Sequence, residues 1–284
     1  MAVQNKVKSS NKTLKINGRL ITFDTPKLMG ILNVTPDSFY DGGKNTTESA
    51  ILHRVEKMIG EGAHFIDVGG YSSRPDAADI PVEEELKRAI PVVKSIAQKF
   101  PEVVISIDTF RSEVARQALE SGAAMINDIS AGELDEEMFP LVARAKIPYV
   151  MMHMRGTPQT MRTLNQYENL TKEVTEYFIK KLDQLKSLKV TDVVIDPGFG
   201  FAKGPTQNFE LLRNLGHLRL LEKPMLIGLS RKSMIWRTLE ITPENALNGT
   251  TVLNTIALLK GADILRIHDV KEAAEAIKLT NFVR

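Results

Sequence analysis

Eight short apolar runs recur along the chain, and most of them end at a single polar residue. Their last residues are Asn33, Asp67, Asp108, Asn127, Met152, Asp196, Gly228 and Arg266. The runs consist of Val, Ile, Leu and Met with little alternation, which is typical of strands buried on both faces of a parallel sheet. The polar residues would then lie at the carboxyl ends of neighbouring strands, and we expect them to form one site.

The segments between these runs are long enough for helices, and most carry helical periodicity. Helices are predicted at residues 46–62, 82–100, 112–122, 136–145, 167–188, 207–215, 232–239, 243–261 and 270–279. Several of these segments end in glycine, a common residue after the last helical turn. Eight strand–helix units predict an α/β fold, a TIM (β/α)8 barrel, for which about 250 residues are typical.

The chain before the first predicted barrel strand has a different pattern. Two short apolar segments, 12–16 and 20–23, flank Asn17-Gly18, which is a strong signal for a two-residue hairpin turn. We expect this hairpin to cover the bottom of the barrel. No shift in composition marks a domain boundary, so we predict a single domain over residues 1–284, with a tail and hairpin at 1–26 and the barrel at 27–284.

Composition narrows the classes of function. The chain has no cysteine, which excludes disulfides, thiolate zinc sites and cysteine nucleophiles. Its formal charge of +2 is small and its basic residues are scattered, so no nucleic-acid partner is expected. No apolar run approaches about 18 residues, and the N-terminal residues lack an apolar core, so neither membrane insertion nor secretion is indicated. We expect a cytoplasmic protein.

Two predicted connections differ from the others. Residues 35–44 and 69–79 are rich in Gly, Pro, Ser and Asp, and they follow the first two barrel strands directly. In a barrel they would overhang the carboxyl ends of the strands, where lids and substrate contacts are found. The alternative is that the two segments are connecting loops without a function, and their position alone does not exclude it.

Asp108, Asn127 and Asp196 would converge from three strands. Together they offer carboxylates and an amide to a ligand with several N–H donors and an acceptor edge, a description that suits a guanidine-like heterocycle. Each alone is equally explained as a cap of the following helix. Asp67 is kept as a secondary member of this group, because a role in fixing the turn at Gly69-Gly70 is the alternative.

An anion site is predicted where residues 228–233 join a strand to a helix. Ser230, Arg231 and Lys232 bring a hydroxyl and two cations to the N-terminus of that helix. The spacing differs from a nucleotide P-loop, which disfavours ordinary nucleotide hydrolysis. Arg266 and His268 lie two residues apart on the eighth strand, so both face the barrel mouth or both face away from it. With a phosphorylated substrate, Arg266 and His268 would be its cations, and an arginine and a histidine exposed to solvent at a strand end are the alternative.

Two apolar side chains are candidates for the wall of a planar ring. Phe201 follows the glycine turn after Asp196, and Met152 ends a strand, although methionine in a buried strand is more often core filler. The other histidines show no metal-ligand spacing. No serine–histidine–aspartate set or covalent lysine arrangement is evident.

Several motifs, taken together in order, resemble those of the dihydropteroate synthase family. They are MGILNVTPDSF at 29–39, DGG at 41–43, IDVGG at 66–70, SRP at 73–75, SIDT at 106–109, IND at 126–128, HMRG at 153–156, DPGFG at 196–200 and SRKS at 230–233. The resemblance spans nearly the whole chain. It implies a TIM barrel that condenses 7,8-dihydropterin-6-ylmethyl diphosphate with 4-aminobenzoate, releases diphosphate with the help of Mg²⁺, and forms a homodimer.

The resemblance also implies a role for each candidate residue. The pterin site would comprise Asp108, Asn127, Met152, Asp196, Phe201, Gly228, Lys232 and Arg266, of which Asp108, Asp196, Lys232 and Arg266 would be catalytic. Asn33, Arg266 and His268 would hold the diphosphate, with Asn33 also serving Mg²⁺. Phe39, Ser73, Arg74, Pro75 and Ser233 would bind aminobenzoate, and Asp41 would belong to the first loop.

The second loop departs from the commoner family pattern. Tyr71, Ser73 and Asp76 stand where Glu, Thr and Gly are expected, and Tyr40 replaces a small residue in the first loop. Ser73 keeps the hydroxyl group, whereas Tyr71 and Asp76 bear on how the loop closes.

Two other functions are compatible with the pterin-binding residues. A methyltransferase domain that acts on methyltetrahydrofolate would share the carboxylates and the amide, but it would not need SRP at 73–75 or SRKS at 230–233. A non-catalytic pterin-binding paralogue would not need to retain the anion-site residues.

Overall fold

Eight parallel strands form the centre of the computed structural model, which describes residues 12–35, 48–74 and 77–283. The strands of the barrel are β3 (Lys27–Asn33), β4 (Phe65–Gly69), β5 (Val104–Asp108), β6 (Met125–Asp128), β7 (Tyr149–Met152), β8 (Val193–Asp196), β9 (Leu226–Ile227) and β10 (Ile264–Ile267). They pair in the order β8-β7-β6-β5-β4-β3-β10-β9. A single bridge between Ile195 and Met225 brings β8 and β9 together, so the barrel is nearly closed. The predicted TIM-barrel fold is confirmed.

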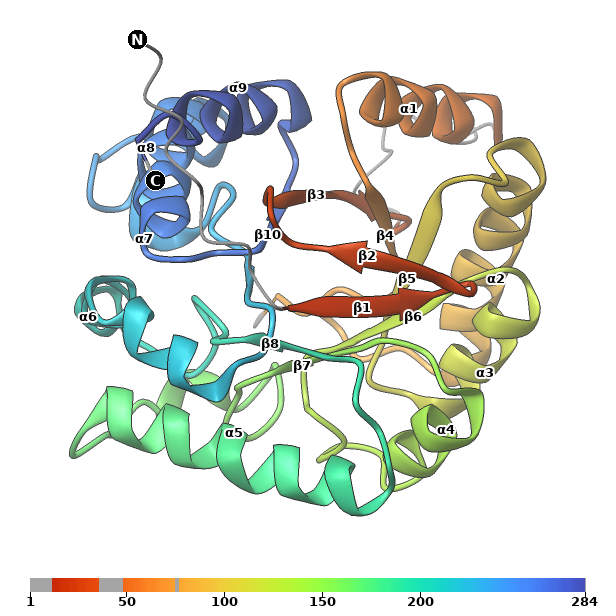
Figure 1. The fold of residues 1–284 in the computed structure, drawn as a ribbon, viewed down its shortest axis with the longest axis horizontal. Coiled ribbons are helices and arrows are strands. Elements are labelled where there is room, and N and C mark those ends of the chain that lie inside the picture. Colours follow the sequence, from red (N-terminus) through yellow and green to blue (C-terminus); the bar gives the residue numbers. More distant parts are fainter. Residues whose placement is uncertain (1–11, 36–47, 75–76, 284) are drawn as a thin grey trace, which may run out of the picture.

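Helices surround the strands in alternation with them (Figure 1). They are α1 (Glu48–Gly60), α2 (Val82–Lys99), α3 (Ser112–Glu120), α4 (Met138–Ala145), α5 (Leu170–Ser187), α6 (Pro205–Arg213), α7 (Ser233–Trp236), α8 (Leu247–Leu259) and α9 (Val270–Thr280). Short 3₁₀ turns lie at Met161–Thr163, Leu215–Leu221 and Pro243–Asn245. Within the described ranges, no helix is both long and apolar enough to cross a membrane.

The helix predictions were right in number and order, but three boundaries need correction. The segment predicted as a helix over 232–239 contains only one helical turn, α7, and Glu240 then adopts a left-handed conformation with φ of 55°. The segment predicted over 243–261 is divided into a 3₁₀ turn and α8. The 3₁₀ helix at Leu215–Leu221 continues the chain after α6, and the prediction of a helix over 207–215 did not include it beyond Leu215.

Each barrel strand has an inner and an outer face, and side chains alternate between them. On β4, Ile66 and Val68 pack outward in the large cluster shared with the helices, whereas Phe65 packs inward. The inner cluster also includes Met29, Met125, Val150, Val194, Leu226 and Ile264, one from each of six other strands. Burying an inner side chain such as Phe65 contributes roughly 2–3 kcal/mol to the free energy of unfolding.

The same alternation determines which side chains point into the barrel nearer the carboxyl ends of the strands. Two residues after Phe65 comes Asp67, two after Met125 comes Asn127, and two after Ile264 comes Arg266. The barrel interior is therefore apolar near the amino ends of the strands and polar near their carboxyl ends. This division gives the site a rigid floor of packed side chains.

A two-stranded ribbon lies across the apolar end of the barrel (Figure 1). It consists of β1 (Thr13–Ile16) and β2 (Arg19–Thr22), joined by Asn17 and Gly18, whose φ angles of 50° and 77° suit a tight hairpin turn. Leu14 and Ile16 belong to the inner apolar cluster. The ribbon therefore closes the bottom of the barrel, as the sequence predicted.

Candidate active site

Arg266, on β10, binds carboxylates from two other strands, β4 and β5. Its Nε donates a hydrogen bond of 2.6 Å to Asp67 Oδ2, and one terminal nitrogen donates at 2.5 Å to Asp108 Oδ2. Asn127 Nδ2 donates to the same Asp67 oxygen at 2.9 Å. The planar guanidinium group suits such a fork between two carboxylates. Four strands are thereby connected through one charged group.

Asp67, kept as a secondary member in the sequence analysis, is a central member of the polar layer near the carboxyl ends of the strands. Its side chain is fully buried inside the barrel, where it accepts hydrogen bonds from Arg266 and Asn127. The signal that identifies it is the two-residue spacing from Phe65, which places both side chains on the inner face. Its position before two glycines had obscured that spacing.

Burial and neighbouring charges act in opposite directions on Asp108. Burial raises the pKa of its carboxyl group, the Arg266 guanidinium lowers it, and the Asp67 carboxylate raises it again, with a result of about 7. Burial disfavours the charged form of Arg266, but Asp67 and Asp108 together raise its pKa above the usual value. Arg266 is therefore always charged, whereas Asp108 changes its protonation state near neutral pH.

Asp196 presents a second carboxylate from β8. Its Oδ1 accepts a hydrogen bond of 2.8 Å from the backbone N–H of Gly198, and its side chain has no other hydrogen-bond donor in the described part of the chain. Burial raises its pKa. Gly198 has φ of 71°, and a side chain there would place its Cβ 2.1 Å from the carbonyl oxygen of His153. Glycine is required here for both conformation and space.

Lys232 lies near Asp196, on the connection after β9. Its Nζ donates a hydrogen bond to the carbonyl oxygen of Phe199 and lies 4.5 Å from the centre of the Phe201 ring. Burial lowers its pKa to about 8, although the Asp196 carboxylate opposes that shift. The side chain thus brings a positive charge next to an aromatic wall.

Met152 and Phe201 belong to that wall. They are 3% and 9% exposed, and they pack with Ile129, Met154, Met161 and Ala202 in an apolar cluster separate from the main core. Gly228, predicted on the same side, has no atom within 4 Å of the position that a Cβ would take, so its backbone borders open space. A flat ligand can therefore contact the backbone at Gly228.

Lys203 was not among the predicted site residues, yet it organises the loop that carries Phe201. Its Nζ lies 2.9 Å from His153 Nδ1 and donates to the carbonyl oxygens of Gly198 and Phe201 at 3.1 and 3.0 Å. Burial lowers the pKa of Lys203 to about 7 and holds the pKa of His153 well below its usual value. The neutral His153 ring therefore accepts from Lys203. Only the buried position of this lysine, which the sequence does not reveal, would have identified it.

Arg231, one of the two cations predicted for the anion site after β9, is bound to a carboxylate of the protein itself. The helix α7 is four residues long, and the guanidinium group of Arg231 is bound to both carboxylate oxygens of Asp269, at 3.0 and 2.7 Å. Ser233, the first residue of α7, is partly exposed. Arg231 therefore has a structural role.

Ser230 and His268 remain available beside Arg266. Ser230 Oγ accepts a hydrogen bond of 3.1 Å from the backbone N–H of His268 and lies 2.9 Å from His268 Nδ1. If the hydroxyl donates to Nδ1, the neutral ring carries its proton on Nε2 and can donate it to a ligand. Burial and the Arg266 charge lower the pKa of His268 to about 4, so it is a neutral donor here and not the cation that was predicted.

The predicted aminobenzoate residues lie partly outside the described residues. Phe39, Asp41 and Pro75 fall there, as do Tyr40 and Asp76, whose departures from the family pattern were noted. Ser73 is partly buried and Arg74 is exposed, on the connection after β4. Neither side chain has a hydrogen bond to another described residue.

The described residues contain no group of three or more His, Cys, Asp or Glu side chains able to hold a metal ion. Asn33, at the end of β3, has a side-chain amide without a hydrogen-bond partner among them, and its Oδ1 is directed near Gly69 and Asp108. Mg²⁺ often takes only one or two protein oxygens and completes its shell with water and substrate phosphates. A single amide oxygen fits that mode.

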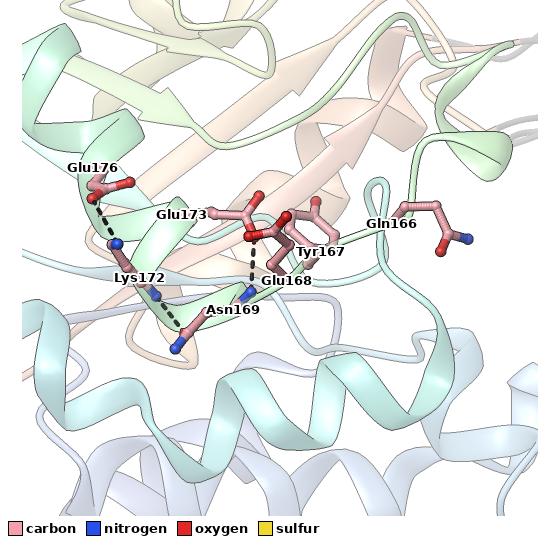
Figure 2. Close-up of a pocket in the computed structure, with 7 residues that line it drawn as sticks. All are labelled: Gln166, Tyr167, Glu168, Asn169, Lys172, Glu173 and Glu176. Atoms are coloured by element: carbon pink, nitrogen blue, oxygen red, sulfur yellow. Dashed lines mark hydrogen bonds and ion pairs between the residues drawn. The ribbon is translucent and has the colours of Figure 1, made fainter.

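A hollow of about 600 Å³ on the outer surface of the protein is unsuited to the predicted substrates (Figure 2). It lies at the start of α5 and is lined by three glutamates, Glu168, Glu173 and Glu176. Its single lysine, Lys172, pairs with Glu176 at 3.9 Å. An acidic surface with a paired cation repels a diphosphate, so we assign no role to this hollow.

Known proteins of the same architecture resemble the chain over most of its length. The family described as pterin binding enzyme matches residues 29–268. Dihydropteroate synthases of Synechocystis sp. and Escherichia coli (strain K12) are each 43% identical, over 89% of this chain and 89% of the first relative, and over 92% of this chain and 93% of the second.

Solved structures of dihydropteroate synthases are also similar to this chain over most of its length. A Yersinia pestis dihydropteroate synthase in a sulfonamide drug complex has a TM-score of 0.90 and 36% identity, covering 96% of this chain and 99% of that one. A Xanthomonas albilineans dihydropteroate synthase with 4-aminobenzoic acid has a TM-score of 0.89 and 38% identity, covering 97% and 98%. Together with the polar layer around Arg266, these matches show that the chain belongs to the dihydropteroate synthase family of pterin-binding enzymes.

Proposed function

We propose that the enzyme joins 7,8-dihydropterin-6-ylmethyl diphosphate to 4-aminobenzoate inside the barrel mouth, with 7,8-dihydropteroate and diphosphate as products. One observation carries this assignment of the site. Carboxylates from three strands, Asp67, Asp108 and Asp196, share the polar layer with the Arg266 guanidinium, beside the apolar wall of Met152 and Phe201. This arrangement is complementary to a flat ring with N–H donors on one edge.

The pterin ring would be held by charge-assisted hydrogen bonds. Asp196 and Asp108 accept from its amino and ring N–H groups, and the Asn127 amide contributes an additional oxygen. The ring lies along Phe201 and against Met152, and Lys232 donates to the carbonyl side of the ring. Because all these groups except Lys232 and Phe201 lie on strands, the ring is bound in one orientation.

The chemical step needs charge stabilisation more than proton transfer. The bond between the pterin methylene carbon and the diphosphate oxygen breaks, and its electron pair leaves with the diphosphate. The dihydropterin ring stabilises the cationic carbon, and the aniline nitrogen of aminobenzoate then forms the C–N bond and releases one proton to solvent. The protein stabilises the departing charge with Arg266 and with the Nε2–H of His268.

Magnesium fits the same end of the site. Asn33 would hold it through the side-chain oxygen, and the bound ion would neutralise charge on the diphosphate. The rest of its coordination would come from water and diphosphate oxygens.

The second substrate would be held outside the pterin ring, toward the connection after β4. Ser73, Arg74 and Ser233 would bind aminobenzoate together with Phe39 and Pro75. A solved relative with 4-aminobenzoic acid supports this ligand class. An exposed arginine is suited to the carboxylate of a ligand that enters from solvent.

A homodimer is the proposed assembly, in the cytoplasm. Exposed apolar side chains lie on α8, α9 and the residues that follow: Val252, Leu259, Leu279, Phe282 and Val283. Leu279 and Phe282 are 70% and 83% exposed, more than an isolated surface usually tolerates in one region. Light scattering of the wild type and of Leu279→Glu tests this: a dimer mass that falls to a monomer mass in the variant supports the interface, and a monomeric wild type refutes it.

Product formation tests the activity most simply. Purified enzyme is incubated with both substrates, with and without Mg²⁺, and dihydropteroate and diphosphate are measured. We expect stoichiometric formation of both products, faster with Mg²⁺ than with EDTA. Binding of the pterin substrate without diphosphate release would indicate a non-catalytic paralogue. Methyl transfer from methyltetrahydrofolate to a corrinoid acceptor would indicate the alternative pterin enzyme.

A further inference from the structure

Tyr71 joins the two ends of the connection after β4. It follows Gly70 and is 8% exposed. Its hydroxyl donates a hydrogen bond of 3.1 Å to Asp79 Oδ1, eight residues further along the chain, and accepts one of 2.9 Å from Gln159 Nε2. Gln159 belongs to the connection between β7 and α5, so the phenol group also links two loops at the barrel mouth.

Arg111 holds the far end of the same connection. Its guanidinium group donates to Asp79 Oδ1 at 3.1 Å and to the carbonyl oxygen of Ile80 at 2.6 Å. A third hydrogen bond, of 2.9 Å, goes to Glu85 Oε2, whose side chain is 1% exposed. Because this arginine is tied to a buried carboxylate on α2, Asp79 has a fixed partner. Tyr71 is therefore attached to a rigid part of the molecule.

Aromatic packing also connects Tyr71 with the apolar cluster that contains Met152 and Phe201. The Tyr71 ring meets the Phe110 ring edge to face, with ring centres 5.0 Å apart and an interplanar angle of 83°. Phe110 in turn packs against the apolar cluster that contains Met152 and Phe201. Tyr71, near the start of the connection after β4, is thus linked through Phe110 to the apolar cluster of Met152 and Phe201.

Two side chains close to Tyr71 form no hydrogen bond with the described residues. Ser73 and Arg74 follow Tyr71 by two and three residues, and neither has a side-chain hydrogen bond to another described residue. The backbone carbonyl of Arg74 accepts a hydrogen bond of 3.0 Å from the N–H of Ala77, and Tyr71 connects the same segment to Asp79, Gln159 and Phe110. A side chain two residues away restricts where a short loop can direct its polar groups.

We propose that Tyr71 is a positioning residue for aminobenzoate: by binding Asp79, Gln159 and Phe110, it holds Ser73 and Arg74 where they meet this substrate. The inference rests on the proposed role of Ser73 and Arg74 as aminobenzoate ligands. It assigns a function to the position at which this chain departs from the commoner family pattern. It also predicts that the phenol hydroxyl affects one substrate and not the other.

The test is the steady-state kinetics of Tyr71→Phe, which keeps the ring and its packing but removes the two hydrogen bonds. We expect the KM for aminobenzoate to rise about threefold to tenfold, because the two lost hydrogen bonds, to the Asp79 carboxylate and from the Gln159 amide, act on this substrate only through Ser73 and Arg74. The KM for the pterin substrate should stay within about twofold, because the strand residues that hold it are unchanged. Gln159→Leu should raise the aminobenzoate KM in the same direction, and the double variant should be less affected than the product of the two single effects.

Tyr167→Phe is the matched control. Tyr167 also donates one phenol hydrogen bond, of 2.9 Å, to the carbonyl oxygen of Ala202, but it has no hydrogen bond or ring contact with the described residues of the connection after β4. Its aminobenzoate KM should equal that of the wild type. Thermal unfolding of each variant checks that the barrel is intact.

Two results would refute the positioning role. One is an unchanged aminobenzoate KM in Tyr71→Phe, and the other is an equal rise of both KM values, which indicates general loosening. Arg74→Ala, measured in parallel, separates this failure from that of the underlying assignment. If Arg74→Ala raises the aminobenzoate KM and Tyr71→Phe does not, only the role of Tyr71 is wrong. If neither variant changes it, the connection after β4 does not bind aminobenzoate.

Discussion

The two halves of the substrate site are built in different ways. On the pterin side, Asp67, Asp108 and Arg266 extend from strands, and their charged groups bind one another inside the barrel. On the aminobenzoate side, Ser73 and Arg74 lie on a connection and have no side-chain hydrogen bond to any other described residue. The pterin half is fixed before a ligand arrives, whereas the other half depends on contacts at the base of a loop.

This difference follows from what each substrate needs. The dihydropterin carries the reacting carbon and must be oriented while its diphosphate leaves, so a rigid, water-poor pocket is an advantage. Aminobenzoate has only to approach with its amine, and loops at a barrel mouth are suited to admit it. Substitutions in the two halves should therefore affect different substrates.

The largest effect is expected from Asp67→Ala. It removes the carboxylate that binds Arg266 and Asn127 and leaves part of a buried charge network uncompensated. Breaking such a network costs roughly 3–5 kcal/mol of the free energy of unfolding. Urea unfolding and the pterin KM should both change strongly. Asp67→Asn, which keeps the shape, should lose less stability, and equal stability of both variants and the wild type would show that the network does not stabilise the barrel.

The next largest effect is expected from Asp196→Asn. The amide oxygen can still accept from the Gly198 N–H, so the loop should stay folded, but an amide cannot replace a carboxylate as acceptor of two N–H groups. We expect the affinity for a pterin analogue to fall by about 2–4 kcal/mol, since hydrogen bonds to a charged group are the stronger kind. Calorimetric titration measures it. An affinity close to that of the wild type would remove Asp196 from the pterin site.

A pH profile separates two charged groups of the pterin half. Below its pKa of about 7, Asp108 gains a proton and becomes a weaker acceptor, so kcat/KM for the pterin substrate should fall toward acid pH. Above its pKa of about 8, Lys232 loses its proton and can no longer donate a charged hydrogen bond, so kcat/KM should also fall toward alkaline pH. Lys232→Met should have low activity without the alkaline decline. A decline that persists in the variant would belong to another group.

The smallest effect is expected from Arg74→Ala. Arg74 is exposed, and a solvated charge contributes little to binding, so the aminobenzoate KM should rise about tenfold or less, with the pterin KM unchanged. Arg162→Ala, another arginine at the barrel mouth, is the control. A rise in the pterin KM of Arg74→Ala instead would mean that the two halves are not separate.

Much of this comparison was predictable from the sequence. Uninterrupted apolar runs specify buried parallel strands, and the ends of those runs correctly placed Asp108, Asn127 and Arg266 in one layer. Asp67 was included with less weight than its position supports, because it follows an inward Phe65 by two residues. The period of two within each run carries that information, and it is independent of the turn that comes next.

Other features depend on contacts that the sequence does not show. Arg231 looked like an anion ligand, but Asp269 binds it, and only the fold brings these two residues together. His268 looked like a cation, but burial beside Arg266 keeps it neutral. Lys203 and Tyr71 act through partners 50 and 88 residues away in the chain. Local patterns cannot predict such pairs, because they arise from tertiary packing.

Calorimetric titration of a pterin analogue, without aminobenzoate, diphosphate or Mg²⁺, tests most directly whether the pterin half is complete by itself. The wild type, Arg74→Ala and Tyr71→Phe should all bind the analogue with the same Kd, because none of the substitutions reaches the strand residues around Arg266. Binding that appears only after aminobenzoate is added, or that weakens in either variant, would contradict the account.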